Sequence, residues 1–421
     1  RELELTLTGK DCGLSERAPM CGIPYHAAET YINRLIDKGY KVAICEQVED
    51  PKLAKGLVKR EVIRVVTPGT NLDVQSLEAS KNNYLMCIAY TSDGIGISAA
   101  DVTTGDYYVT EVEDLRKLKD ELMKYEPSEI ICNEAFLVSG YDVEDLKSRL
   151  HMSVSSLESH MFDDDGCRRI LMRHFKVNTL IGLGVEEFPT GILAAGALLQ
   201  YLYDTQKTDL EHFTHISPYL TSKYMLLDSS TRRNLELTET LREKQKRGSL
   251  LWVLDKTKTA MGGRLLRNYI EQPLIDKEEM EKRLDAIQEL NQDSISRDEI
   301  REYLNPVYDL ERLLSKVTYK TANPRDLIAF RNSLQMLPPI KTVLAGFQKE
   351  ELAAIREEID GLEDIYQLID EAIVEEPPIS IREGGMIKDQ FDETIDHLRA
   401  AKHDGKQWLV QLEEEDRERT G

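Results

Sequence analysis

The change of sequence pattern near residue 220 is the feature that most constrains the fold. Before it, short apolar runs rich in Val, Ile and Tyr are separated by turns that contain Gly and Pro, which is typical of strands with a few helices between them. After it, apolar residues recur mainly at helical spacing. A chain of 421 residues is also too long for one ordinary core. We therefore expect two mixed α/β domains followed by an all-α region.

The first 72 residues predict a small mixed α/β domain. LELTLT alternates like a strand, and YKVAICEQV and REVIRVVTPGT are typical of two further strands. A loop rich in Gly and Pro leads from the first strand into a helix over AAETYINRLID, which Gly39 would end. We place this domain at residues 1–72 and a polar linker at 73–82.

Residues 83–215 predict a second α/β domain. NYLMCIAYTSDGIGISAADVTTGDYYVTEV contains three strand-like runs separated by SDG and TTGD, which indicates antiparallel strands joined by turns. A charged helix over EDLRKLKDELMKY and an apolar strand over SEIICN follow. The helix-like segment GILAAGALLQYLYDTQK, rich in Ala and Leu, closes this domain.

Residues 216–421 predict a helical domain. The stretch from 228 to 274 reads as helical almost throughout, with Ser230 or Thr231 as its N-cap. NPRDLIAFRNSLQML begins another helix, with Pro in its first turn. From about residue 389, one helix of about thirty residues would be about 45 Å long. The chain starts in a strand-like pattern and stops in a helix-like one, so we expect it to be part of a longer protein.

Charge is unevenly distributed along the chain. The formal net charge is −22, yet residues 1–70 carry eleven Lys and Arg against ten Asp and Glu, while the remainder carries 43 against 66. If the chain contacts nucleic acid, the near-neutral N-terminal segment is the better candidate, because the acidic remainder repels phosphates except where basic side chains cluster. No apolar run is long enough to span a membrane and no secretory signal opens the chain, so we expect a cytoplasmic location without membrane contact.

Three tempting chemistries have simpler structural readings. Cys21 and His26 could form a thiol–imidazole or metal site, but a loop fixed by Gly and Pro explains them better, and no C-x-x-C pair occurs. Asp101, Asp106 and Glu111 could hold metal ions in a nuclease, although turn and strand-end positions explain the two aspartates. No G-x-x-x-x-G-K-[ST] motif exists for a nucleotide phosphate.

Several long phrases of this chain resemble the MutS family of bacterial DNA mismatch repair proteins. LTGKDCGLSERAPMCGIPYHAAETYINRLIDKGYKVAICEQVEDP and VKREVIRVVTPGT resemble its mismatch-binding domain. GVEEFPTGILAAGALLQYLYDTQK resembles the end of its connector, and DSSTRRNLELTE, SLLWVLDKTKTAMGGRLLRNYI and RLLSKVTYKTANPRDL resemble its helical core. The resemblance covers essentially all 421 residues in order. It implies a ribonuclease H-like connector and a helical lever domain over 216–421.

The resemblance also implies a function and names parts that this sequence does not contain. Family members bind mispaired or looped duplex DNA with a Phe-x-Glu motif, whose ring wedges into the base stack; that motif would precede Arg1. The clamp and a Walker-type ATPase and dimerisation domain would follow Gly421. The resemblance thus implies no catalysis and no cofactor for these residues, but ATP and Mg, and a homodimer, for the intact parent.

Candidate binding residues follow from their place in the resembling segments. For DNA we expect backbone contacts from basic side chains and a minor-groove contact from Met20; the candidates are Lys10, Met20, Lys59, Arg60 and Arg64. For a MutL-type repair partner we expect a connector patch of Arg168, Arg169 and Leu171. Two alternatives stay open: a metal-dependent nuclease centred on the connector, and a scaffold of the same superfamily that clamps other DNA structures without a wedge.

Overall fold

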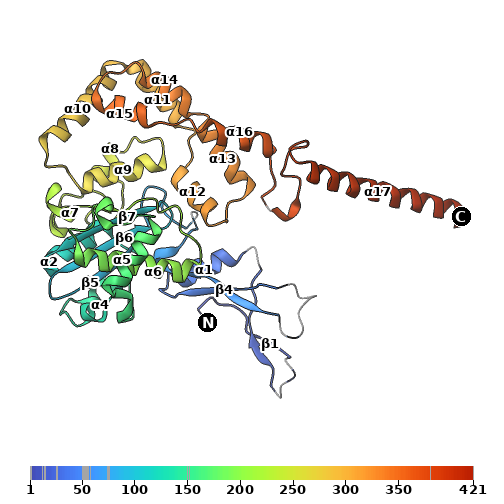
Figure 1. Cartoon of the computed structure of the whole chain (residues 1–421), viewed down its shortest axis with the longest axis horizontal. Coiled ribbons are helices and arrows are strands. Elements are labelled where there is room, and N and C mark those ends of the chain that lie inside the picture. Colours follow the sequence, from blue (N-terminus) through green and yellow to red (C-terminus); the bar gives the residue numbers. More distant parts are fainter. Residues whose placement is uncertain are drawn as a thin grey trace. The chain divides into compact units, whose positions relative to one another are not determined.

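The computed structural model describes residues 2–11, 13, 16–24, 27–49, 56, 58–73, 76–148, 150, 152–379 and 381–420. It divides into two compact units (Figure 1). The first unit comprises Arg1–Asp285 and Asp309–Thr321, and the second comprises Ala286–Tyr308 and Ala322–Gly421. The N-terminal part is mixed α/β and a helical part follows it, as the sequence pattern predicts.

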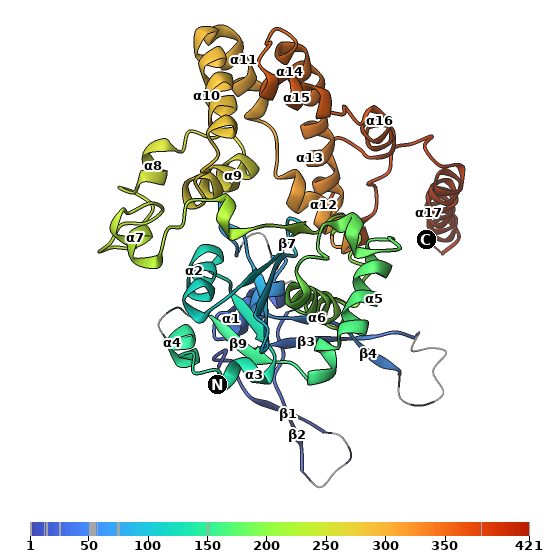
Figure 2. The ribbon, with the colours of Figure 1, turned by 60° about the vertical axis from the view of Figure 1, so that its left-hand side comes forward.

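In its described residues, the N-terminal part of the first unit contains two separate hairpins and one α-helix (Figure 2). The elements are β1 (Thr8–Lys10), β2 (Ala18–Met20), α1 (Ala28–Ile36), β3 (Val42–Gln47) and β4 (Arg60–Val66). Helix α1 packs Ile32 and Ile36 against Val66 of β4 in a small core. Gly39 follows the helix with φ +81°, a conformation that glycine adopts without strain.

The predicted first strand was wrong in its extent. Of LELTLT and the residues after it, only Thr8–Lys10 form a strand, and its partner Ala18–Met20 lies in the segment predicted to be a loop. A strand needs a partner for its backbone N–H and C=O groups, and alternation alone does not show where that partner is.

A six-stranded sheet forms the centre of the first unit. Its order is β10-β7-β6-β5-β8-β9, with antiparallel β7, β6 and β5, and with β8 parallel to β5 and β9 parallel to β8. The strands are β5 (Leu85–Tyr90), β6 (Ile95–Asp101), β7 (Asp106–Val112), β8 (Glu129–Cys132), β9 (Ser153–Ser156) and β10 (Ser217–Pro218). The helices around it are α2 (Leu115–Tyr125), α3 (Glu134–Leu137), α4 (Val143–Ser148), α5 (Asp164–His174) and α6 (Pro189–Gln206). The predicted three-strand meander, charged helix, apolar strand and Ala-rich helix are all confirmed.

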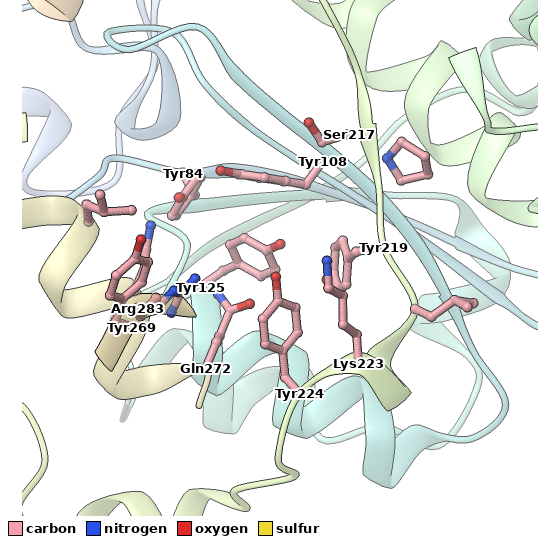
Figure 3. Close-up of a pocket in the computed structure, with 14 residues that line it drawn as sticks. Tyr84, Tyr108, Tyr125, Ser217, Tyr219, Lys223, Tyr224, Tyr269, Gln272 and Arg283 are labelled. Carbon is pink, nitrogen blue, oxygen red and sulfur yellow. The ribbon is translucent and has the colours of Figure 1, made fainter. Parts of the chain in front are cut away.

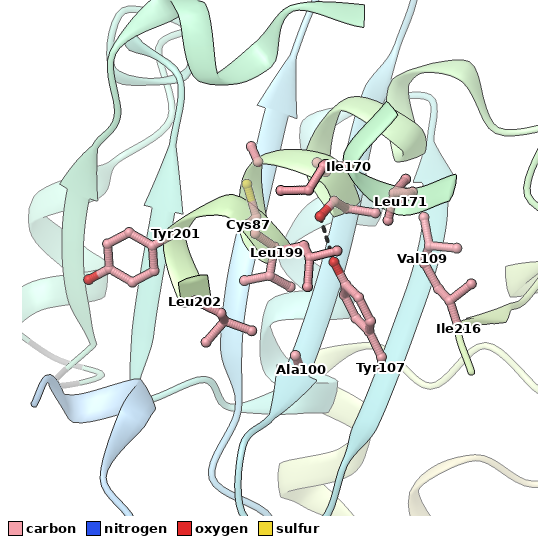
Figure 4. Packing of buried hydrophobic residues seen from close by; sticks show 14 of the residues in the cluster. Cys87, Ala100, Tyr107, Val109, Ile170, Leu171, Leu199, Tyr201, Leu202 and Ile216 are labelled. Atoms are coloured by element: carbon pink, nitrogen blue, oxygen red, sulfur yellow. Dashed lines mark hydrogen bonds between the residues drawn. The ribbon is translucent and has the colours of Figure 1, made fainter. Parts of the chain in front are cut away.

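Both faces of this sheet are buried, which explains the unbroken apolar run of β5. Leu85, Cys87 and Ala89 belong to the core that contains α5 and α6, whereas Met86 and Ile88 belong to the core that contains α2. Successive side chains of a strand point to opposite faces, so a strand covered on both sides loses the polar alternation. Figure 4 shows the α5–α6 core, in which the Tyr107 hydroxyl donates to the Ala195 carbonyl at 2.5 Å.

The helical region begins in the first unit and continues in the second. The first unit contains α7 (Ser229–Asn234), α8 (Leu250–Leu254), α9 (Ala260–Glu271) and α12 (Leu310–Thr318). Helix α10 (Lys277–Gln292) starts in the first unit and ends in the second. The second unit contains α11 (Ser294–Leu304), α13 (Pro324–Leu334), α14 (Leu337–Leu344), α15 (Glu350–Glu358), α16 (Glu363–Ala372) and α17 (Glu393–Thr420).

The sequence located some helices better than others. Helix α13 starts where predicted, because Asn323 and Asp326 cap each other's backbone and Pro324 occupies the first turn. The prediction that 228 to 274 is helical almost throughout was wrong, since only three short helices with non-helical segments between them occupy this range. The first N-cap is Asp228 rather than Ser230 or Thr231. The long final helix is confirmed at 28 residues, or about 42 Å.

The segment between the α/β parts is fixed by two buried arginines of the helical region. Arg264 of α9 donates to the Ala79 carbonyl at 2.9 Å. Arg312 of α12 donates to the carbonyls of Glu78 and Lys81 at 3.1 and 2.8 Å. Buried carbonyls need such donors, so the described part of the predicted polar linker is held in one conformation.

Two partly buried histidines of the first unit predict a pH dependence of stability. Burial lowers the pKa of His212 from about 6.5 to about 4 and also lowers the pKa of His174. Below pH 6.5 the unfolded chain binds protons that the folded chain does not, so this stability is present above pH 6.5 and is lost as the pH falls towards 4. We expect His212→Phe to reduce the slope of unfolding free energy against pH in this window, measured by urea titration. His160→Phe, at an exposed histidine, is the control, and equal slopes for both variants would contradict the assignment.

Among the residues that the structure describes, none of the helices is both long enough and apolar enough to cross a membrane.

Candidate nucleic-acid interface

The β1–β2 hairpin brings two of the candidate DNA-binding residues to one face. Thr8 pairs with Met20 and Lys10 pairs with Ala18, and the Thr8 hydroxyl donates to the Met20 carbonyl at 2.8 Å. Residues two apart on a strand, and residues directly opposite in an antiparallel pair, share a face. Lys10 and Met20 therefore lie diagonally on the same face, and both are exposed, Met20 by 44%.

Arg17 is a basic residue of this hairpin that the sequence reasoning did not single out. It is exposed and precedes β2, and its Cβ lies 3.1 Å from where a Cβ of Gly9 would be. The sequence shows Arg17 within SERAPM and Gly9 several residues earlier. Their closeness becomes meaningful only once the pairing of β1 with β2 is known. The side-chain stem of Arg17 thus crosses the hairpin beside Gly9.

The three basic candidates at β4 are in different environments. Lys59 is exposed but forms an ion pair with Glu61 at 2.5 Å. Arg60 is exposed opposite Gln47 and, within the described part of the chain, has no ion-pair partner. Arg64 is only partly exposed, its Nε has no hydrogen-bond partner, and burial lowers its pKa. Arg60 is therefore the most accessible cation of this strand, and Arg64 the least suited to a phosphate contact.

A buried glutamate joins the β3–β4 hairpin to the six-stranded sheet. Glu129 of β8 is fully buried and accepts hydrogen bonds from Tyr201 at 2.8 Å, from the backbone N–H of Gly69 at 3.2 Å and from the Thr67 hydroxyl. Lys41, just before β3, lies 3.0 Å from the same carboxylate. A buried carboxylate is stable only with such partners, so this contact fixes β3 and β4 beside β8 and α6.

The structure gives the carboxylates of the nuclease alternative structural partners. Asp101 is buried and accepts from the backbone N–H groups of Thr103 and Asn83 at 2.8 and 2.9 Å. Glu111 accepts from the first backbone N–H groups of α6, at Thr190 and Gly191. No cluster of three or more metal-ligating side chains occurs among the described residues. These contacts explain the acids without metal chemistry.

Of the two residues considered for a thiol–imidazole site, Cys21 and His26, the structure describes only Cys21. Cys21 is an exposed free cysteine. His26 lies outside the described residues, so their separation is not defined.

The predicted partner patch on α5 is corrected at one of its three positions. Leu171 is fully buried in the α5–α6 core, because it is on the inner face of an amphipathic helix, and it cannot contact a partner (Figure 4). Arg169 is exposed. Arg168 forms ion pairs with Asp164 at 3.0 Å and Glu186 at 2.8 Å.

Comparison with protein-family models matches the chain in three consecutive segments. Residues 1–75 match MutS domain I, residues 83–216 match MutS domain II and residues 230–419 match MutS domain III. These three segments correspond, in order, to the N-terminal hairpins, to the six-stranded sheet with its helices, and to the helical region.

Curated relatives agree with these matches over the whole chain. The DNA mismatch repair protein MutS of Lachnoclostridium phytofermentans is 63% identical over 421 residues, which are 100% of this chain and 45% of that protein. The proteins of the same name from Ruminiclostridium cellulolyticum and Acetivibrio thermocellus are 51% and 50% identical over 100% of this chain and 48% of each relative. The chain thus spans about half the length of these relatives. Because its three parts match MutS domains I, II and III in order, the chain belongs to the MutS family.

Proposed function

We propose that this chain is the part of a DNA mismatch repair protein that contacts mispaired or looped duplex DNA. The observation that carries the proposal is the face of the β1–β2 hairpin on which exposed Lys10 and Met20 lie together. A cation beside an apolar side chain suits a groove, since the cation binds phosphate while the apolar group packs against the bases. The names of the relatives support this function, and no observation favours the scaffold alternative.

In the proposed function, recognition of a mismatch depends on how easily the DNA deforms at the mispaired step. A mismatched step unstacks at a lower free-energy cost than a paired one, so a protein that bends DNA there binds mismatches more tightly. Such a protein needs its contact residues on a rigid base. Here the Glu129 contacts and the hydrogen bond from Gln206 to the Val65 carbonyl at 3.2 Å supply a base for β3 and β4.

Removing a hairpin cation should weaken DNA binding without changing its sequence preference. We expect Lys10→Gln and Arg60→Gln each to lower affinity for matched and mismatched duplexes alike, because phosphate contacts do not read bases. Each should also reduce the slope of log affinity against log salt by about 1. Fluorescence anisotropy with a labelled duplex at several salt concentrations measures both quantities.

Arg116→Gln is the matched control for this experiment. Arg116 is 94% exposed on α2 and the substitution removes the same formal charge. It should leave the salt slope unchanged. If Arg116→Gln and Arg60→Gln weaken binding equally, the effect is one of net charge and the proposed interface is wrong.

The remaining parts of the parent protein's activity are also proposals. We propose a homodimeric parent that binds ATP and Mg through sequence not contained in these 421 residues, where no phosphate-loop motif occurs, and that signals by ATP to downstream repair factors. No step of this chain is assigned to a nucleotide.

For the middle of the chain we propose a ribonuclease H-like connector at residues 83–215. Three antiparallel strands followed by two parallel ones, covered by helices on both faces, support it. Arg168 and Arg169 remain the proposed contact with a MutL-type partner. We keep 1–72 as the mismatch-binding domain, 73–82 as the linker and 216–421 as the lever domain.

A further inference from the structure

A pocket lined by tyrosines lies in the first unit (Figure 3), and its lining includes no residue of the β1–β2 or β3–β4 hairpin. Its cavity volume is about 680 Å³, which is within the range of about 300–1,000 Å³ typical of small-molecule sites. Nothing described so far uses this pocket. We propose that it binds a small planar aromatic anion.

The floor and walls of the pocket are aromatic. Tyr84 and Tyr125 are each only 6% exposed, and their rings meet edge to face with centroids 4.9 Å apart. Tyr108 and Tyr219 extend the cluster, with centroids 5.9 and 6.4 Å from that of Tyr125. Tyrosine rings offer a flat apolar ligand both faces and edges at little entropic cost.

One face of α9 forms the opposite wall. Leu265, Asn268, Tyr269 and Gln272 line the pocket, and their spacing of three and four residues places them on a single helical stripe. Leu265 and Tyr269 are 51% and 39% exposed, so they form an apolar rim around an open mouth. The two amide side chains add polar groups that could orient a ligand.

The charged groups that line the pocket are both cationic. The Arg283 guanidinium lies 3.7 Å from the centroid of the Tyr269 ring, and Lys223 reaches the pocket from the other side (Figure 3). Within the described part of the chain, neither forms an ion pair with a carboxylate. A guanidinium stacked on a ring keeps its N–H edge available for a carboxylate or phosphate.

The nearby acids have partners of their own: Glu121 forms an ion pair with Lys124 at 3.2 Å, and burial raises the pKa of Asp106. Glu121 accepts a hydrogen bond from the Tyr219 hydroxyl, and Asp106 accepts one from the Tyr108 hydroxyl at 3.3 Å. Burial raises the pKa of Tyr84, Tyr125 and Tyr219, so the phenols stay neutral. An aromatic surface with two uncompensated cations selects an aromatic ring that carries a negative charge.

The test uses 2-naphthoate as the probe and the full 421-residue chain, titrated by calorimetry. We expect saturable binding at ligand concentrations up to about 1 mM. Arg283→Gln should weaken it at least about tenfold, because a charge-assisted pair of hydrogen bonds is lost, and Lys223→Gln at least about threefold. The neutral analogue 2-naphthalenemethanol should bind more weakly than naphthoate to the unsubstituted chain.

The matched control is Arg247→Gln, which removes an exposed arginine outside the pocket. It should bind naphthoate like the unsubstituted chain. Circular dichroism establishes that each variant is folded, and Arg283→Lys, which keeps the charge, should retain more affinity than Arg283→Gln. Absence of saturable binding, or equal affinities for Arg283→Gln and Arg247→Gln, would overturn the proposal.

Discussion

Replacing Arg264 with methionine is expected to lower the free energy of unfolding of the first unit by about 3 kcal/mol. The guanidinium is 4% exposed and binds both carboxylate oxygens of Asp309 at 2.7 Å and Glu311 at 2.6 Å. Methionine fills a similar volume, but it removes the two-pronged donor of Asp309 and the donor to the Ala79 carbonyl. Asp309 then keeps only the longer contacts to Arg312, at 3.3 Å from its backbone N–H and 3.7 Å from its guanidinium. The value is at the lower end of the range for buried pairs because Glu311 is 44% exposed.

Urea unfolding, with hydrogen exchange of the β5 amides to identify the transition, measures this loss. Arg168→Met is the matched control, because Arg168 also binds two carboxylates but is 26% exposed. It should lose about 1 kcal/mol or less. Asp309→Asn added to Arg264→Met should recover part of the loss, because it removes a largely buried carboxylate charge that has lost its closest partner. Similar losses for Arg264→Met and Arg168→Met would show that burial is not the deciding factor.

Replacing Gly96 with alanine is expected to cost about 3 kcal/mol or more. An ideal Cβ at this position would lie 1.9 Å from the Thr190 carbonyl oxygen and 2.7 Å from the Gly191 nitrogen. These are backbone atoms of the first turn of α6, and the Glu111 carboxylate holds their N–H groups. The helix would therefore have to move away from β6, which disrupts the α5–α6 core.

Gly182→Ala is the control for this substitution, since no atom lies within 4 Å of its ideal Cβ and its φ is not positive. It should change stability by no more than about 0.5 kcal/mol. Thermal unfolding by circular dichroism and the yield of folded protein compare the two. An unchanged midpoint for Gly96→Ala would mean that α6 accommodates a methyl group, contrary to the close approach in the structure.

Elements with a local cause were predictable from the sequence. The N-terminus of α13 depends on Asn323, Pro324 and Asp326, which are adjacent in the chain and cap the helix whatever surrounds it. The strands of the meander and the apolar β8 were predictable because burial on a sheet leaves a pattern within each strand. The long helix α17 was predictable because apolar residues recur at helical spacing along it.

The candidate DNA site was predictable only as a set of residue types in the least acidic segment. The sequence listed Lys10, Arg60 and Arg64 as equivalent cations, but packing leaves the first two exposed and partly buries the third. It also grouped Leu171 with Arg169, although they face opposite sides of α5. Exposure depends on neighbours that are distant in sequence, so a list of charges does not determine it.

By itself the sequence determined the order of the parts, the local elements with strong patterns and, through its long phrases, the family. Only the tertiary structure decided that Ala18–Met20 pairs with Thr8–Lys10, that Arg264 and Arg312 hold the linker, and that tyrosines from several elements line one pocket. The physical reason is the separation along the chain of the residues that each interaction joins. Capping and periodic burial act within a few residues, whereas strand pairing, ion pairs and cavities join residues tens to hundreds of positions apart.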